Sequence, residues 1–409
     1  MVAFASDDSI HSFFYFNDTQ SILKFSRPVS AWAYYLDRKV DLRTQKEFPF
    51  TIPELHEHLS KIALFASAPR ARPRVIHLNY NFGRVLQGEH SASLSPLCLD
   101  LEYDSVEPCL FRPPKKDIGV QIHGPNFEEY SRRFEKCFEA LLRGDSYQLN
   151  LTAPFRCEFD SACTTDIVSA FLARKKMLGA YAHVTTIPSL GLSLLSNSPE
   201  CLFQASLAGE QSINLWSMPI KGTWKVPVEA DRKKINQQLL HDKKNQNELF
   251  IIIDLIRNDL SKIEHPRAKL LAKKLSLSVP GLAHMASLIS VELSRKISLG
   301  QILSALFPGG SITGAPKKRT MEILAGVENY DRDFYSGSTI LLWKKAAAAS
   351  INIRTLQLDL NKNVGVYGSG GGITLRSEVR AEYEEMFAKV ASFTGFFKAK
   401  SQTWGPDKG

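Results

Sequence analysis

The chain has 409 residues, of which 44% are hydrophobic and 23% charged, with 51 lysines and arginines against 42 acidic residues. This composition is typical of a globular protein with one large domain or two or three smaller ones, and it excludes collagen-like, low-complexity and mostly disordered chains. The net charge of +9 fits a nucleic acid, an anionic membrane surface or a small anionic substrate as binding partner.

Targeting signals and cysteines indicate the compartment. Asp7 and Asp8 stand where a secretory signal needs a basic start and an apolar core, and no apolar run approaches the roughly 20 residues of a membrane helix. We therefore expect a cytoplasmic protein with no membrane segment. The six cysteines, at positions 98, 109, 137, 157, 163 and 201, form no C-x-x-C pair, which predicts reduced thiols rather than a zinc site or a disulfide framework.

The densest basic cluster consists of Arg70, Arg72 and Arg74, with Pro69 before them and Pro73 between the last two. No aromatic residues are interleaved with these arginines, as they are in many nucleic-acid surfaces. A solvated loop is therefore favoured over a nucleic-acid contact, and we expect no nucleic-acid partner.

The first 115 residues contain short apolar runs broken by proline, serine and charge, and they end in the sequence Pro113-Pro114-Lys115-Lys116. Such punctuation predicts a boundary. We expect residues 1–115 to form an amino-terminal region that contributes to the same α+β body. Residues 116–400 would form the main region, and 401–409 a polar tail.

The periodicity after this boundary predicts both helices and strands. Apolar residues recur at helical spacing from Phe127 to Leu141, and Gly144 follows where a C-cap glycine belongs. A strand follows, with Gln148, Asn150 and Thr152 on one face. Further strands are predicted at 181–187, 192–195, 213–218, 339–343, 350–358 and 364–367, and helices at about 229–241, 245–260, 316–326 and 378–393. Because strands come in neighbouring runs, we predict an α+β fold with antiparallel sheets rather than a doubly wound parallel sheet.

Two glycine-rich segments are candidate ligand sites. The segment from Phe307 to Lys317 places glycines before a helix, where free amides, the helix dipole and the lysine charge favour an anion. A tight turn without a ligand explains the same residues equally well. The run from Gly368 to Gly372 follows a strand and precedes a helix, and it is a weak signal for close approach of the backbone to a ligand.

Four glutamates and one lysine are candidates for chemistry. Glu382 and Glu385 share a helix face, whereas Glu248 lies on another predicted helix and Glu200 ends a turn. Oxygen ligands of this kind suit Mg²⁺, although four solvated glutamates are the simpler interpretation. Lys221 lies at the end of an apolar strand, where partial burial favours a neutral amine nucleophile, but most lysines at strand ends reach solvent.

Seven motifs in order, between about 127 and 393, give the chain a strong resemblance to the chorismate-utilising enzymes. They are Gly144 to Leu151, Ser198-Pro199-Glu200, Pro219 to Thr223, Asp254 to Leu260, Phe307 to Lys317 with Met321-Glu322-Ile323, Ile353-Arg354-Thr355, and Glu382 to Glu385. The resemblance implies two antiparallel β-sheets packed together with helices on the outside. It also implies a Mg²⁺ site that holds the ring carboxylate of chorismate.

The resemblance assigns roles to individual residues. It places Glu248, Glu385 and Glu382 among the metal ligands, and Glu200, Lys221 and His284 among the catalytic residues, with His284 near the departing C4 hydroxyl. Its substrate contacts are Gln148, Thr313, Lys317, Arg354, Gly370, Gly371 and Gly372. The alternative for His284 is an ordinary core histidine.

Two positions discriminate within the family. Members that add water at C2 of chorismate carry a lysine base where this chain has Gln148, and anthranilate synthases carry alanine where it has Lys221. The chain thus resembles the aminodeoxychorismate synthase branch, in which the lysine amine is thought to attack C2 before ammonia enters at C4. The product, 4-amino-4-deoxychorismate, leads to 4-aminobenzoate and folate. The alternatives are an anthranilate synthase large component and, from another class, a noncatalytic anion-binding or nucleic-acid-binding protein.

The source of ammonia is a separate question. Amidotransferases hydrolyse glutamine with a reactive cysteine on a sharp turn flanked by glycine, and none of the six cysteines has a glycine neighbour. We therefore expect the chain to use chorismate and free ammonia, and to need a separate glutamine amidotransferase subunit to use glutamine.

Overall fold

The computed structural model describes residues 9–65, 72–89, 93–160, 163–225, 232–264, 267–279 and 282–402. Asp7, Asp8 and Arg70, which entered the predictions above, lie outside these ranges. Within the described residues, none of the helices combines the length and the apolar character that crossing a bilayer requires.

The chain forms a mixed α+β structure, as predicted. The helices are α1 (Ile52–Ser60), α2 (Tyr80–Leu86), α3 (Phe127–Leu142), α4 (Thr164–Ala173), α5 (Arg232–His241), α6 (Lys243–Ser261), α7 (Leu299–Leu306), α8 (Gly310–Thr313), α9 (Lys317–Val327) and α10 (Val379–Thr394), with short 3₁₀ turns at Lys175–Met177 and Pro188–Leu190.

The strands are β1 (His11–Phe16), β2 (Ser21–Tyr34), β3 (Arg38–Asp41), β4 (Lys46–Pro49), β5 (Arg74–Leu78), β6 (Cys98–Cys109), β7 (Gly119–His123), β8 (Gln148–Phe159), β9 (Tyr181–Ile187), β10 (Leu192–Ser198), β11 (Cys201–Leu207), β12 (Ser212–Met218), β13 (Ile220–Lys225), β14 (Lys269–Val279), β15 (Leu282–Ser294), β16 (Gly314–Ala315), β17 (Ser338–Trp343), β18 (Ala346–Ile351), β19 (Thr355–Asp359), β20 (Val364–Ile373) and β21 (Lys398–Gln402). The last strand reaches Gln402, so the first two residues of the expected polar tail belong to it.

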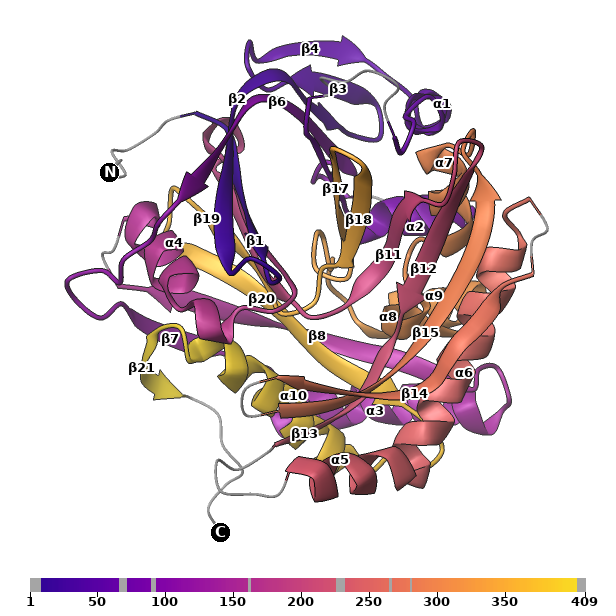
Figure 1. Cartoon of the computed structure of the whole chain (residues 1–409). Coiled ribbons are helices and arrows are strands. Elements are labelled where there is room, and N and C mark those ends of the chain that lie inside the picture. Colours follow the sequence, from indigo (N-terminus) through magenta and orange to yellow (C-terminus); the bar gives the residue numbers. More distant parts are fainter. Residues whose placement is uncertain are drawn as a thin grey trace.

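The strands make two sheets that are joined along one edge (Figure 1). One sheet runs in the order β21, β7, β8, β20, β19, β10, β9 and β1, and the other in the order β6, β5, β17, β18, β11, β12 and β15, with β13 and β14 on β15. Strand β2 pairs with both β1 and β6 and so links the sheets. All of these pairings are antiparallel except that of β7 with β21.

The core has three parts, which follow from this layering. One apolar cluster lies between the first sheet and helices α3, α4 and α10, and includes Tyr130, Phe171 and Met386. A second lies between the other sheet and helices that include α1, α6 and α7. The third, with Phe25 and Tyr103, lies between the two sheets. Helices therefore cover the outer faces while the sheets face each other, as the family resemblance implies.

The amino-terminal region is built into both sheets. Strand β1 pairs with β9, and β5 pairs with β17, so strands from before residue 115 are hydrogen-bonded to strands that follow it. The two described arginines of the basic cluster are paired with acidic residues of β6: Arg72 with Asp104 and Arg74 with Asp100. These ion pairs offset part of the positive charge of the two arginines.

Two predicted elements differ from the structure. The single strand expected at 350–358 is two strands, β18 and β19, because the chain turns between them and Arg354 adopts a left-handed conformation with φ of 52°. The glycine run at 368–372, expected to follow a strand, is instead the end of strand β20 and pairs with β8. Both differences fall on residues of the candidate site.

Candidate active site

A cavity of about 440 Å³ lies where the ends of β8, β13, β15 and β20 meet helices α6, α8 and α10. This volume lies within the range of small-molecule sites in proteins. Most of the predicted site residues line it together, although they come from positions nearly 200 residues apart in the sequence. They are Glu200, Lys221, Glu248, His284, Arg354, Gly370, Gly371, Gly372, Glu382 and Glu385.

The glycine end of β20 forms one wall of this cavity. A Cβ atom on Gly370 would lie 2.2 Å from the carbonyl oxygen of Leu151, and one on Gly372 would lie 2.4 Å from Nε2 of Gln148. The contact at Gly370 is with backbone, so only glycine fits there, whereas at Gly372 the Gln148 side chain would have to move. The pairing of β20 with β19 ends at Tyr367, and the glycines beyond it line the cavity with their backbone.

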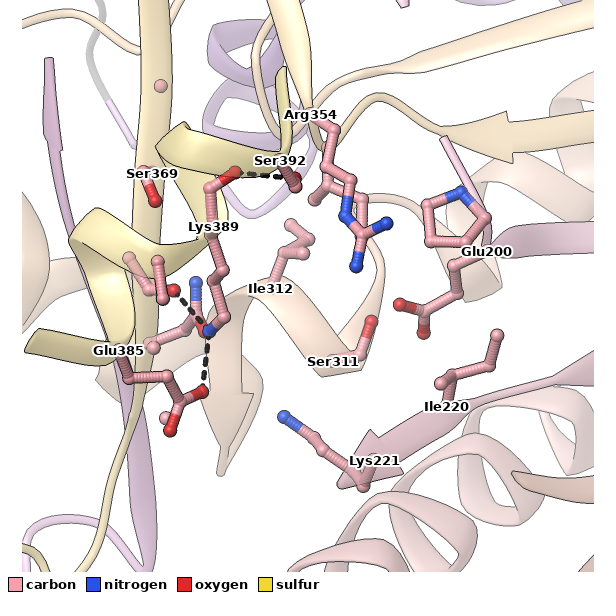
Figure 2. Close-up of a pocket in the computed structure, with 18 of the residues that line it drawn as sticks. Glu200, Ile220, Lys221, Ser311, Ile312, Arg354, Ser369, Glu385, Lys389 and Ser392 are labelled. Atoms are coloured by element: carbon pink, nitrogen blue, oxygen red, sulfur yellow. Dashed lines mark hydrogen bonds and ion pairs between the residues drawn. The ribbon is translucent and has the colours of Figure 1, made fainter. Parts of the chain in front are cut away.

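Arg354 supplies positive charge from the link between β18 and β19. Its carbonyl oxygen accepts a hydrogen bond of 3.0 Å from the Asn197 amide, which holds the left-handed turn in place. A non-glycine residue in this conformation is uncommon and costs about 1 kcal/mol or more. Figure 2 shows the guanidinium projecting into the cavity between Lys389 and Glu200. Burial lowers the pKa of Arg354, but a guanidinium stays charged in a protein.

Glu200 and Lys221 face each other across a second part of the cavity. Figure 2 shows both side chains directed toward its interior, with the hydroxyl of Ser311 between them. Glu200 follows β10, and its turn is fixed by hydrogen bonds from the Ile351 amide to its carbonyl oxygen and from its own amide to Ser198 Oγ. Burial raises the pKa of the Glu200 carboxyl, and the charge of Lys221 opposes this shift. A carboxyl group with a raised pKa can hold a proton and donate it.

His284 lies on β15, beside the strand that carries Lys221. In the antiparallel register Lys221 is opposite Met285, and His284 is opposite Thr223. The imidazole is buried, and this burial, together with the charge of Arg354, lowers its pKa to about 4. His284 is therefore neutral at pH 7, so it can accept a proton or hydrogen-bond as an imidazole but carries no charge.

Three glutamates form an acidic wall on helices α6 and α10. Asp242 caps α6 by accepting a hydrogen bond of 2.8 Å from the Asn245 amide, which sets the helix start and places Glu248 on the cavity. On α10, Glu382 is buried and accepts 2.7 Å from Ser377 Oγ, whereas Glu385 lies one turn later at the rim.

The acidic wall fits Mg²⁺ in its donor type, since all of its donors are oxygens. Within the described part of the chain, no three His, Cys, Asp or Glu residues are grouped closely enough to hold a metal by themselves. Mg²⁺ commonly takes one or two carboxylates and completes its shell with waters and substrate oxygens. The glutamates Glu248, Glu382 and Glu385 therefore fit an ion that is held jointly with a ligand.

Three predicted substrate contacts do not line the cavity. The Lys317 ammonium is buried and pairs with Asp259 Oδ2 at 2.7 Å, with the carbonyl oxygen of Leu306 at 3.2 Å. Thr313 is buried and donates 3.0 Å to the Gly309 carbonyl oxygen. Gln148 packs over Gly372, beside the cavity wall. Lys317 thus stabilises the glycine-rich segment from within, with its ammonium held by Asp259 rather than on the cavity wall.

Lys389 is a cavity residue that the sequence analysis missed. Its Nζ donates to Glu385 Oε1 at 2.8 Å and to the Gly370 carbonyl oxygen at 2.7 Å (Figure 2). Helical spacing could have found it, because Lys389 follows Glu382 and Glu385 by seven and four residues and so shares their face of α10. Ser311, Tyr335 and Tyr367 also line the cavity, and no spacing rule connects them in the sequence.

Comparison with protein families matches residues 33–395 to the chorismate binding enzymes. The chain belongs to this family. Among curated proteins, it is 33% identical over 288 residues to "Probable aminodeoxychorismate synthase, chloroplastic" of Oryza sativa, with 69% of this chain and 31% of that protein covered. It is 32% identical over 266 residues to "Aminodeoxychorismate synthase component 1" of Escherichia coli, with 64% and 56% covered.

The structural comparison agrees at the level of the fold. Anthranilate synthase component I of Streptococcus pneumoniae superposes with a TM-score of 0.73 at 17% identity, covering 96% of this chain and 94% of that one. The two curated relatives are longer, and the matched region spans 31% and 56% of their length.

Proposed function

We propose that this chorismate binding enzyme aminates chorismate with ammonia, giving 4-amino-4-deoxychorismate. The observation that carries the proposal is the direction of Lys221, whose amine points into the cavity that also holds Glu200, Arg354 and the acidic wall (Figure 2). The names of the curated relatives support the same activity. Cytoplasmic location, Mg²⁺ dependence and supply of ammonia by a partner are parts of this proposal.

Substrate binding follows from the charges of the cavity. Chorismate carries two carboxylates, and Arg354 with the backbone of Gly370 to Gly372 offers a positive group and amides to one of them. Glu248, Glu382 and Glu385 would hold Mg²⁺, which when bound supplies the positive charge that the ring carboxylate needs next to an acidic wall.

The first chemical step uses Lys221 as nucleophile and Glu200 as acid. The Lys221 amine, in its neutral form, bonds to C2, the two ring double bonds move to C1=C6 and C4=C5, and the C4–O bond breaks. Glu200, whose raised pKa favours the protonated form, gives its proton to the departing hydroxyl, which leaves as water.

The second step reverses the first with a new nucleophile. Ammonia forms a bond to C4, both ring double bonds shift back to C5=C6 and C1=C2, and the bond between C2 and the Lys221 nitrogen breaks. The new C4 ammonium returns a proton to Glu200, and the lysine leaves as a free amine. The net reaction converts chorismate and ammonia to aminodeoxychorismate and water, with both residues restored.

The cysteines support a separate source of ammonia. Burial raises the pKa of Cys98, Cys137, Cys157 and Cys201, so these thiols are poor nucleophiles. Cys163, which is exposed, lies immediately before helix α4 and donates to Asp166. We therefore propose that a glutamine amidotransferase subunit delivers ammonia to this chain.

A product assay tests the function. The purified chain would be incubated with chorismate, Mg²⁺ and ammonium salt above pH 8, and the product analysed by chromatography and mass spectrometry. We expect a product that keeps its pyruvyl ether, with no turnover of glutamine until an amidotransferase is added. Release of pyruvate with formation of anthranilate would establish the anthranilate synthase alternative, and no turnover of chorismate would overturn the proposal.

A further inference from the structure

The ion pair between Lys389 and Glu385 places an ammonium group at the acidic wall. Its Nζ joins Glu385 Oε1 at 2.8 Å to the carbonyl oxygen of Gly370 at 2.7 Å, so that it connects helix α10 with strand β20 (Figure 2). In this arrangement the lysine holds the same carboxylate that is a candidate ligand for Mg²⁺.

Lys389 and a Mg²⁺ ion would compete for this carboxylate. A Mg²⁺ ion bound to Glu385 would lie within a few ångströms of the Lys389 ammonium, and like charges at such a distance repel strongly. The pair is also easily opened, because the side chains of Lys389 and Glu385 are 34% and 56% exposed. Ion pairs with this exposure contribute little to stability.

We propose that Lys389 occupies the cation position of Glu385 in the free protein and releases it when Mg²⁺ binds. The released ammonium stays on the cavity wall, next to Gly370, and there it pairs with a carboxylate of the substrate. The inference rests on the proposed function, since it assumes a Mg²⁺ ion and a substrate with carboxylates. It adds that metal and substrate each favour the binding of the other, because the substrate draws away the group that competes with the metal.

Direct metal titration tests the exchange. Mn²⁺ binding, followed by electron paramagnetic resonance, and Mg²⁺ binding, followed by calorimetry, would be measured on the full chain without chorismate. Lys389→Met is expected to bind either ion roughly fivefold or more tightly than the unmodified chain, because the competitor is gone. Lys389→Arg keeps the charge and is expected to bind no more tightly than the unmodified chain.

Lys362→Met is the matched control for net charge. Lys362 also pairs with an acidic residue on its own segment, Asp359 at 3.1 Å, but it lies outside the cavity and is 75% exposed. We expect its metal affinity to equal that of the unmodified chain. Lys389→Gln provides a second neutral variant, and circular dichroism would show which of the two is folded.

The coupling to substrate gives a second measurement. Chorismate is expected to tighten Mg²⁺ binding in the unmodified chain, and to do so by a smaller factor in Lys389→Met. Equal metal affinities of Lys389→Met, Lys389→Gln and the unmodified chain would overturn the inference while leaving the metal site in place. If no variant bound metal even with chorismate present, the metal site would be overturned and the exchange with it.

Discussion

At the scale of single residues, Lys221 is the side chain on which the proposed chemistry depends. Replacing it with alanine removes the nucleophile but leaves Arg354, the glycine strand and the acidic wall unchanged. We expect Lys221→Ala to lower kcat for amination by a factor on the order of 10³ or more, with chorismate binding retained. Steady-state assays with ammonium and equilibrium binding of chorismate would measure the two effects.

Lys273 offers a control for this variant, because its ammonium stacks over the ring of Phe250 at 4.3 Å and does not line the cavity. Lys273→Ala should keep nearly full activity. If Lys221→Ala turned over chorismate at the normal rate, direct addition of ammonia to C4 would replace the covalent route.

The acidic wall leads to a prediction about metal dependence. Glu248→Gln and Glu385→Gln each exchange a carboxylate for a neutral amide, which is a poorer ligand for a hard cation. We expect the Mg²⁺ concentration for half-maximal activity to rise about tenfold or more in each variant. Glu322→Gln, on the outer helix α9 and paired with Arg319, should not change it. Unchanged metal titration curves for both cavity variants would contradict the ligand assignment.

Lys317 and Lys389 show which features of the site the sequence alone can predict and which it cannot. Lys317 follows a glycine-rich segment, and that position indicated an anion site, but its ammonium turns inward to Asp259, which is 58 residues earlier in the chain. Lys389 gave no motif by itself, yet it lies at the cavity beside Glu385. Local sequence predicts the charge of a segment, whereas the direction of a long side chain depends on contacts from elsewhere in the fold.

At the scale of elements, strand β20 shows most clearly how backbone positions the site. Gly370→Ala would place a Cβ atom 2.2 Å from the Leu151 carbonyl oxygen, and neither backbone can move without breaking the pairing of β20 with β8. We expect this variant to lose about 1–3 kcal/mol of unfolding free energy, together with affinity for chorismate. Urea denaturation and substrate titration would measure both losses.

Gly326→Ala is the opposite case and a control for this prediction. Gly326 lies in helix α9, and a Cβ atom there would meet nothing within 4 Å. Alanine should stabilise the protein by about 0.5–1 kcal/mol, because glycine is a poor helix former. A Gly370→Ala variant as stable as Gly326→Ala would show that the strand pairing does not restrict this position.

The elements that the sequence predicted well are those with a strong local pattern. The amphipathic helix predicted from Phe127 is α3, and Gly144 beyond its end has a φ of 77°, as a C-cap glycine should. The sequence predicts that the glycine run now found in β20 follows the strand, because glycine is depleted in strands and usually marks turns. Here close packing against Leu151 and Gln148, which are distant in sequence, overrides that preference.

At the scale of the whole molecule, the two sheets enclose polar groups that no local pattern predicted. His77 on β5 and His183 on β9 come from different sheets, and their ring centroids lie 5.8 Å apart. His77 hydrogen-bonds with Thr339 at 2.9 Å and with Thr185 at 3.0 Å. Joining these residues requires both sheets to be in place, so their environment is a property of the complete fold.

This buried pair makes stability depend on pH. Burial lowers the pKa of His183 to about 4 and that of His77 well below its usual range, whereas both would titrate near 6.5 in the unfolded chain. Between these values the unfolded state binds more protons than the folded state, so acid favours unfolding. The unfolding free energy should be constant above about pH 7 and fall steadily as the pH drops from 6.5 to 4, by about 3 kcal/mol for His183.

Replacing the histidine separates this effect from the titration of carboxylates. His183→Phe keeps an aromatic ring beside Phe14, on which the imidazole stacks at a centroid distance of 5.4 Å, but it removes the titratable group. Whatever its stability at pH 7.5, its unfolding free energy should fall less steeply between pH 6.5 and 4.5 than that of the unmodified chain. The measurement is a series of urea denaturation curves on both proteins across this range. Parallel pH profiles would mean that His183 binds a proton in the folded chain as readily as in the unfolded one, and this result would contradict a buried, neutral histidine between the sheets.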